Sequence, residues 1–358
     1  MKRFFLFVTS AFLSLHALAQ TEVTSYTPGV TQEGITYFLP KTCIRVVINA
    51  TKKHHIPGEF CEYADRYLHL KDVAQTAYDE WNINSIKLYT YGTADKDKAY
   101  SIKLKQKTSA PLVTLSPDGR LLSVNATSSE KEPVLPLPSV TKNKDKVING
   151  EDFKTEEILS AGSTSKMAEL TANEIYDIRE NRGLLTKGQA DFMPKDGEQL
   201  KLMLSNLDTQ EEGLLQLFKG SVTSETHVFA FDITPKNDIE KQVLFNFSKY
   251  LGIVDNDDPA GTPYYISVKD LKTLPATDIE AKGKQKENNT DIKYIVPSKA
   301  KVSVFTDQTE ITSQTFAMAQ FGNIENLGGE LFNKKSTTHV QLSPSTGNIS
   351  NIEAARPE

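Results

Sequence analysis

Residues 164–220 constrain the fold of this chain most strongly, because they predict two helices in a sequence that otherwise favours strands. The first helix is expected to begin near Ser163, whose hydroxyl can accept a hydrogen bond from a free backbone N–H group. It is expected to end at Asn181-Arg182-Gly183. Its apolar residues recur at a spacing of three or four: Ala168, Ala172, Ile175 and Ile178. A narrow stripe of this kind suits close packing against another helix.

The second helix is predicted to start at Asp196, because Gln199 follows three residues later in the pattern of a capping box. Gly220 is expected to end it. At about 1.5 Å per residue, this helix would be roughly 35 Å long. Its apolar stripe consists of Leu200, Leu204, Leu207, Leu214 and Phe218. Together the two segments predict a long helical hairpin.

One acidic residue, Glu211, falls on the apolar stripe of the second helix. A buried carboxylate is strongly destabilising unless a cation neutralises it. Arg179 and Arg182 on the first helix are the candidate partners. The pattern therefore predicts a structural ion pair between the helices, and full solvation of Glu211 would contradict it.

Strand patterns lie on both sides of the helices, where apolar and polar residues alternate. The aromatic residues are 17 Phe and 13 Tyr with one Trp, a composition typical of strand-rich proteins. Pro40 interrupts the first strand and predicts a bend or a sheet edge there. The expected fold class is α+β and β-rich, with two antiparallel-sheet portions separated by the long helical hairpin.

The expected organisation follows from these patterns. A signal peptide at 1–19 precedes an N-terminal β-rich domain at 20–126, and a linker at 127–150 is rich in Ser, Lys, Glu and Pro. The helical hairpin spans 151–225, and a C-terminal β-rich domain spans 226–358. Residues 113–119 resemble residues 340–347, which raises the hypothesis of duplicated β units; shared turn chemistry is the alternative.

The first 19 residues have the pattern of a secretion signal. Lys2 and Arg3 precede a short apolar run, and Ala17-Leu18-Ala19 is a small-x-small cleavage site. Cleavage would leave Gln20 first and change the formal net charge from −5 to −7, because both removed charges are positive. A mildly acidic chain argues against nucleic acid as a partner. No later apolar run is long enough for a transmembrane segment.

The two cysteines, Cys43 and Cys61, leave two readings open. In an exported chain they can form a disulfide, which would close a loop of about 18 residues and contribute about 3 kcal/mol. The alternative is two free thiols, because spacing in sequence does not establish the close Cα approach that a disulfide requires.

Three short motifs resemble catalytic or metal-binding patterns, and each has a simpler structural interpretation. Ser163-Thr164-Ser165-Lys166 has the Ser-x-x-Lys spacing of penicillin-recognising enzymes, but no Lys-Thr-Gly or Lys-Ser-Gly follows, so a helix cap is favoured. His54-His55 and the oxygen-rich residues 255–258 favour turns over metal sites. We therefore expect no catalytic residues, no cofactor and no metal.

Several stretches together resemble an uncharacterised family of exported proteins from Bacteroidota, classed as a domain of unknown function. These stretches are residues 34–46, 174–182, 193–220, 245–253 and 319–322. The resemblance implies an envelope or secreted location, and it brings no known activity or catalytic residue.

The expected function is that of a non-enzymatic envelope protein, in the periplasm, outer-membrane associated or secreted. Its partner would be another envelope protein or a surface assembly. The alternative is an envelope hydrolase or glycan-binding protein whose site is assembled from residues distant in sequence. A deep pocket with convergent carboxylates would favour the alternative, and an exposed apolar patch would favour the first function.

Overall fold

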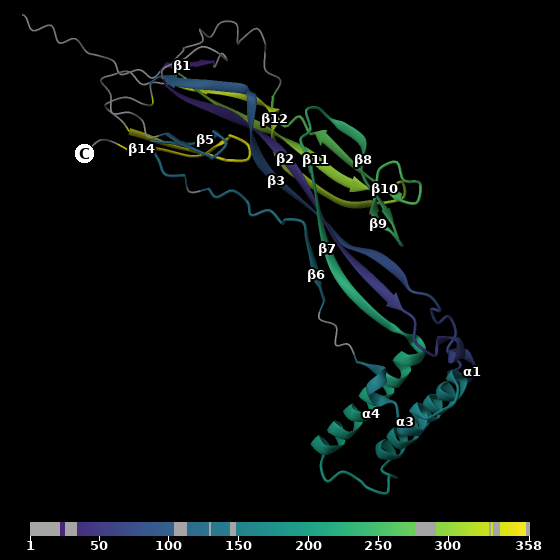
Figure 1. The fold of residues 1–358 in the computed structure, drawn as a ribbon. Coiled ribbons are helices and arrows are strands. Elements are labelled where there is room, and N and C mark those ends of the chain that lie inside the picture. Colours follow the sequence, from purple (N-terminus) through teal and green to yellow (C-terminus); the bar gives the residue numbers. More distant parts are fainter. Residues whose placement is uncertain are drawn as a thin grey trace, which may run out of the picture.

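The computed structural model describes residues 22–25, 34–103, 113–128, 130–143, 148–275, 291–328, 331 and 337–355. The expected signal peptide at 1–19 lies outside these residues. Figure 1 shows an elongated molecule with helices at one end and three antiparallel sheets toward the other. The fold is therefore β-rich, as predicted from the sequence.

The first and third sheets combine strands from distant parts of the chain, whereas the second is built from consecutive strands. The first has the order β1 (Glu22–Ser25), β3 (Tyr78–Lys103), β2 (Ile35–Ile56), β7 (Ser221–Ile233), β6 (Ser139–Lys142). The second has the order β12 (Glu310–Leu327), β11 (Ile292–Phe305), β10 (Thr262–Asp270), β8 (Ile239–Ser248), β9 (Gly252–Val254). The third has the order β14 (Ile349–Ala355), β13 (Thr337–Leu342), β5 (Leu121–Val124), β4 (Val113–Leu115). The first and third sheets thus cross the boundaries expected at 126 and 226, and the second lies within the C-terminal portion.

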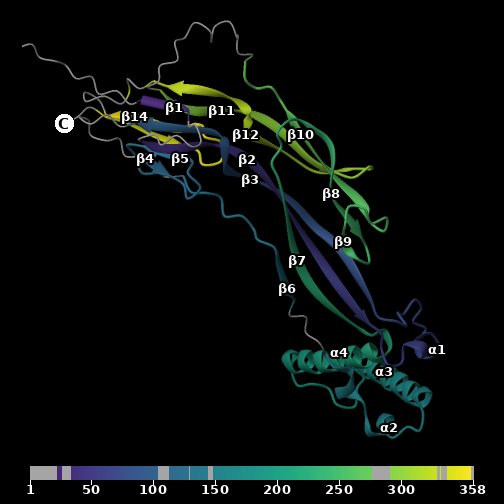
Figure 2. The ribbon, with the colours of Figure 1, turned by 45° about the horizontal axis from the view of Figure 1, so that its top comes forward.

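Strands β2, β3 and β7 form a long ribbon that joins the two ends of the molecule (Figure 2). The 22 residues of β2 span roughly 70 Å at about 3.3 Å per residue. One stretch of the ribbon packs on the second sheet through Ile44, Ile48 and Phe245, which belong to one buried core. Beyond this core the ribbon continues to the helices, so it holds them away from the second and third sheets.

Pro40 sits inside β2, next to a bulge between Phe38 and Leu39. The strand tolerates proline because β7 pairs with β2 only from Ile44 onward, which leaves one side of β2 open at Pro40. The side chain of Gln320 on β12 fills part of this open edge. It accepts from the Thr42 N–H at 3.0 Å and donates to the Thr42 carbonyl at 2.9 Å. The predicted irregularity at Pro40 is confirmed.

Two turns make equivalent contacts with the long strands. Gly119 O accepts from the Phe38 N–H at 2.9 Å, and Gly347 O accepts from the Ile295 N–H at 3.1 Å. Phe38 and Ile295 each lie two residues before a proline. Both strands pair with the strand that follows them, β2 with β3 and β11 with β12. On its opposite edge, however, β2 pairs with β7, which comes later in the chain, whereas β11 pairs with β10, which comes earlier. This difference in strand order argues against duplication of the whole portion.

Two long helices, α3 (Thr164–Lys187) and α4 (Gly197–Lys219), form the helical end. The start of α4 is confirmed, because the Asp196 side chain accepts from the Gln199 N–H at 2.8 Å. The predicted end of α3 at Gly183 is wrong. Gly183 costs only about 1 kcal/mol relative to alanine, Leu185 beyond it is buried, and Gly188 caps the helix with φ of 69°.

Short helices pack around this pair: η1 (Cys61–Tyr63), α1 (Ala64–Leu68), η2 (Gly150–Phe153) and α2 (Glu156–Leu159). The end of β2 docks closely on the last turns of α4. The Phe60 N–H donates to the Leu217 carbonyl at 2.7 Å, and a Cβ at Gly58 would lie 2.3 Å from the same oxygen. This close approach requires glycine and fixes the ribbon to the helices.

Candidate functional site

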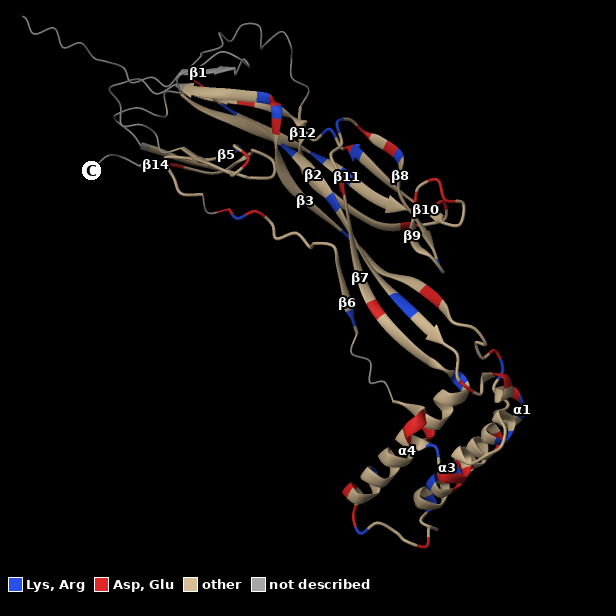
Figure 3. Cartoon of the chain, in the orientation of Figure 1, with Lys and Arg blue, Asp and Glu red and all other residues tan. Residues whose placement is uncertain are grey.

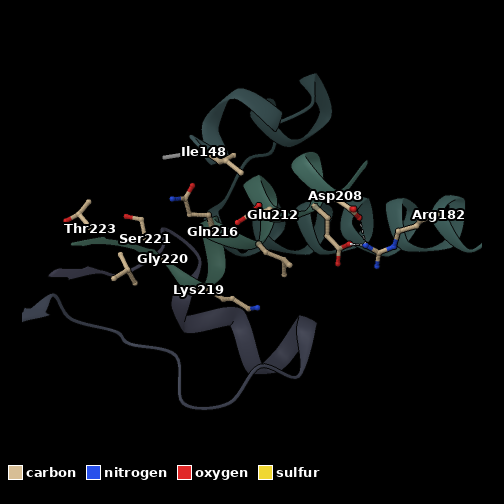
Figure 4. A pocket seen from close by; sticks show the side chains of 12 residues that line it. Ile148, Arg182, Asp208, Glu212, Gln216, Lys219, Gly220, Ser221 and Thr223 are labelled. Carbon is tan, nitrogen blue, oxygen red and sulfur yellow. Dashed lines mark hydrogen bonds and ion pairs between the residues drawn. The ribbon is translucent and has the colours of Figure 1, made fainter. Parts of the chain in front are cut away.

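The candidate site is built around Glu211, which α4 places against α3. The residue is only 7% exposed. Its Oε1 accepts from Arg179 Nε at 2.7 Å, and its Oε2 lies 2.9 Å from Arg182 Nη1. The same Nη1 lies 2.8 Å from Asp208 Oδ1 (Figure 4). The structure therefore brings together the three residues that the sequence singled out, Glu211, Arg179 and Arg182.

Electrostatics follow from this geometry. The hydrogen bond from Arg182 to Asp208, supported by the nearby Glu211 carboxylate, raises the pKa of the Arg182 guanidinium above its ordinary value. Both arginines remain charged in any case, so each can neutralise the buried carboxylate. The network cross-links the two helices.

A pocket of about 420 Å³ opens beside this network, between the second half of α4, the start of β7 and Ile148 (Figure 4). Its lining contains both positively and negatively charged side chains, so it can contact a ligand group of either charge. The pocket cannot be predicted from the sequence, because its residues come from separate elements whose proximity leaves no local pattern. Its polar lining includes Arg182, Glu212, Gln216, Lys219, Ser221 and Thr223.

The two cysteines are free in the structure. Cys43 is buried in β2, where its sulfur lies 3.0 Å from Thr234 Oγ1 and 3.3 Å from Thr93 Oγ1. Cys61 lies in η1, beyond the end of the strand. Cys43 and Ile56 are thirteen positions apart in the extended strand, a span of roughly 40 Å, whereas a disulfide requires Cα atoms within about 7 Å. A Cys43–Cys61 disulfide is therefore incompatible with this fold, and the alternative of free thiols applies.

The other motifs have structural roles. Ser163 accepts from the Lys166 N–H as the cap of α3, and Lys166 Nζ bonds Glu169 at 2.8 Å. His54 and His55 are strand residues that face Asp79 and Glu80, at 2.7 and 3.5 Å. Within the described part of the chain, no group of three His, Cys, Asp or Glu residues is arranged to hold a metal ion.

Exposed apolar side chains gather at the free end of the helix pair. Phe192 is 87% exposed in the segment between α3 and α4, and Met193 follows it at 46%. Leu202, near the start of α4, is 62% exposed. The sequence carries one signal for this group, which is the pair of adjacent large apolar residues in a polar loop.

A family model described as a domain of unknown function, DUF4831, matches residues 33–350. The chain belongs to the DUF4831 family. The DUF4831 match covers the ribbon, the helix pair, the pocket and the exposed apolar end. No curated protein and no solved structure matches the chain. Among the helices that the structure describes, none is long and apolar enough to cross a membrane.

Proposed function

We propose that this DUF4831 protein is an exported, non-enzymatic component of the cell envelope that binds another protein through the free end of its helix pair. The exposure of Phe192 carries the proposal. A phenylalanine that is 87% exposed, with Met193 and Leu202 exposed at the same end, is an unfavourable surface for an isolated protein. Contact with a partner would remove these side chains from water.

The architecture supports the same role. The ribbon of β2, β3 and β7 places α3 and α4 at one extremity, where a partner can approach without meeting the second and third sheets (Figure 2). In this proposal α3 and α4 act as one helical hairpin between two β-rich portions. The resemblance to exported Bacteroidota proteins and the pattern of residues 1–19 support an envelope location.

Export has its own test. We expect the protein recovered from its native cells to begin at Gln20, because signal peptidase requires small residues such as Ala17 and Ala19 before the cut. Intact-mass measurement of the purified protein checks the terminus. Ala19→Leu should retain the first 19 residues. A wild-type protein that still carries Met1 would contradict export through this signal.

Partner binding is tested by placing a photo-crosslinking amino acid at Phe192 in living cells. The matched control is Leu137, which is 71% exposed in the segment before β6. We expect one stoichiometric adduct from position 192 and none from position 137. Phe192→Asp should reduce recovery of that partner by about tenfold or more, because a buried aromatic anchor often dominates an interface. Identical adducts from both positions would rule out a specific site at the helix end.

A second candidate function rests on the 420 Å³ pocket, whose lining includes three acidic residues of α4, Asp208, Glu211 and Glu212. Carboxylates that line a pocket suit a soluble envelope ligand, such as a glycan or a peptide, or its hydrolysis. Screens of glycans and peptides by thermal shift, repeated with Lys219→Ala, separate this function from the first. Retention of partner crosslinking at Phe192 in Lys219→Ala would show that the two sites are independent.

A further inference from the structure

A second surface of α4 carries an inference that goes beyond the proposed partner site. A shallow groove of about 360 Å³ runs along the first half of this helix. The groove is lined by residues whose positions differ by three, four or seven, together with adjacent pairs, so they form one face of the helix. They are Gly197, Leu200, Lys201, Leu204, Ser205 and Asp208.

This face is only partly covered by the rest of the described chain. The buried residues of α4 are all in its second half, beginning at Glu211. Leu200 and Leu204 are partly exposed even though they belong to the apolar stripe. The first half of α4 therefore presents apolar surface that α3 does not fully cover.

Two opposite charges on this face can pair reciprocally. Lys201 and Asp208 are seven residues apart on the same side of the helix, and the point midway between them falls between Leu204 and Ser205. If a second copy of α4 packs antiparallel about a two-fold axis at the midpoint, Lys201 of each copy lies beside Asp208 of the other. A two-fold interface requires this kind of match, because the same patch must complement itself. The small residues Gly197 and Ser205 allow the helices to approach closely.

The local charge also permits two copies to meet. Residues 187–208 contain three lysines and four acidic residues, so this half of the pair is close to neutral. Figure 3 shows the two signs interspersed on α3 and α4. The Asp208 carboxylate is held in place by Arg182, which contacts Oδ1 at 2.8 Å. A fixed carboxylate loses less conformational entropy when it pairs with a second cation.

We propose that this face of α4 is the two-fold interface of a homodimer, with Leu204 at its centre and reciprocal Lys201–Asp208 ion pairs on its sides. The interface is separate from the proposed partner site. At about 100° per residue, Leu202 lies roughly 130° around the helix from the centre of the groove. A dimer joined at α4 would still expose Leu202 to another protein.

Charge reversal tests the pairing by analytical ultracentrifugation of the full chain. Lys201→Glu and Asp208→Lys should each weaken dimerisation by about tenfold, because each homodimer then faces two like-charge contacts. An equimolar mixture of the two variants should dimerise as well as wild type, since both contacts in the mixed dimer join opposite charges. Leu202→Glu is the matched control and should leave the dimer unchanged.

A cysteine crosslink locates the axis and does not depend on the charge variants folding well. In a Cys61→Ser background, Ser205→Cys should form an intermolecular disulfide on mild oxidation, because the two copies of residue 205 lie beside the axis. Asn206→Cys, one residue further around the helix, should crosslink far less. Wild type that remains monomeric at about 100 μM overturns the proposal. A dimer that Ser205→Cys does not crosslink and that charge reversal does not weaken also overturns it.

Discussion

Arg120→Met is expected to destabilise the protein by about 2–3 kcal/mol, because it removes the hydrogen bonds that a buried guanidinium donates to two carboxylates and a carbonyl. Arg120 follows the turn between β4 and β5 and is only 3% exposed. Its Nε donates to both carboxylate oxygens of Asp118, at 2.8 and 2.9 Å. Its two terminal nitrogens bond the Pro344 carbonyl and the Glu132 carboxylate. The methionine stem would fill part of the volume and satisfy none of these acceptors.

The effect should be large because the three acceptors come from three separate segments. Asp118 belongs to the β4–β5 turn, Pro344 to the turn after β13, and Glu132 to the segment that leads to β6. Arg120 thus connects the third sheet to the chain that crosses toward the helices. Arg120→Lys should cost less than Arg120→Met, because an ammonium keeps the charge but cannot reach all three acceptors in the fork geometry of a guanidinium.

The pH dependence of stability tests whether the Arg120–Asp118 ion pair causes this loss. Burial alone would raise the pKa of Asp118, but hydrogen bonds from Ser116 and Arg120 outweigh it and hold that pKa below its usual value. A lowered folded-state pKa adds stability above the unfolded-state pKa, and this stability is lost as the pH falls through the folded value. The difference in stability between wild type and Arg120→Met should therefore shrink below about pH 4.

Urea unfolding at neutral and acid pH measures this difference. Arg66→Met is the matched control, since Arg66 is exposed and should cost less than about 1 kcal/mol. If Arg120→Met unfolds at the same urea concentration as Arg66→Met, then Arg120 does not hold the three segments together.

The helices could be predicted from sequence because their signals are local. Asp196, Gln199 and Gly220 mark the ends of α4 within a few residues, and the structure keeps those ends. Glu211 stood out because a carboxylate on an apolar stripe needs a cation, and a helix pair offers few places for one. The end of α3 was missed because Gly183 weakens a helix without ending it, and burial of Leu185 offsets the weakness.

The sheet partners and the pocket could not be predicted, because alternation identifies the faces of a strand and not its neighbours. Nothing in β7 indicates that it pairs with β2 from Ile44 to Ile56, and nothing in β5 indicates its pairing with β13. Arg120 follows Pro117-Asp118-Gly119, where an arginine ordinarily faces water. Its burial depends on Glu132 and Pro344, and the latter lies more than two hundred residues further along the chain.

The double variant Arg179→Leu with Arg182→Leu is expected to destabilise the helix pair by about 3–5 kcal/mol, because it leaves Glu211 buried without a cation. Each single variant should cost much less, since the remaining arginine still neutralises the carboxylate. The loss should concentrate in α3 and α4, because the ribbon and sheets have separate cores. Hydrogen exchange of the two helices, read beside that of β2, measures this local effect.

Adding Glu211→Leu to the double variant distinguishes charge from packing. If the cost arises from an unpaired buried carboxylate, the triple variant should recover most of the lost stability, because replacing a complete buried ion network by apolar side chains is often neutral or stabilising. If the cost arises from lost packing of the arginine stems, the triple variant should remain as unstable as the double. Recovery of stability in the triple variant would mean that the Glu211 network adds little net stability. Its main role would then be to fix how α3 and α4 align. The proposed dimer face and the exposed Phe192 both depend on that alignment.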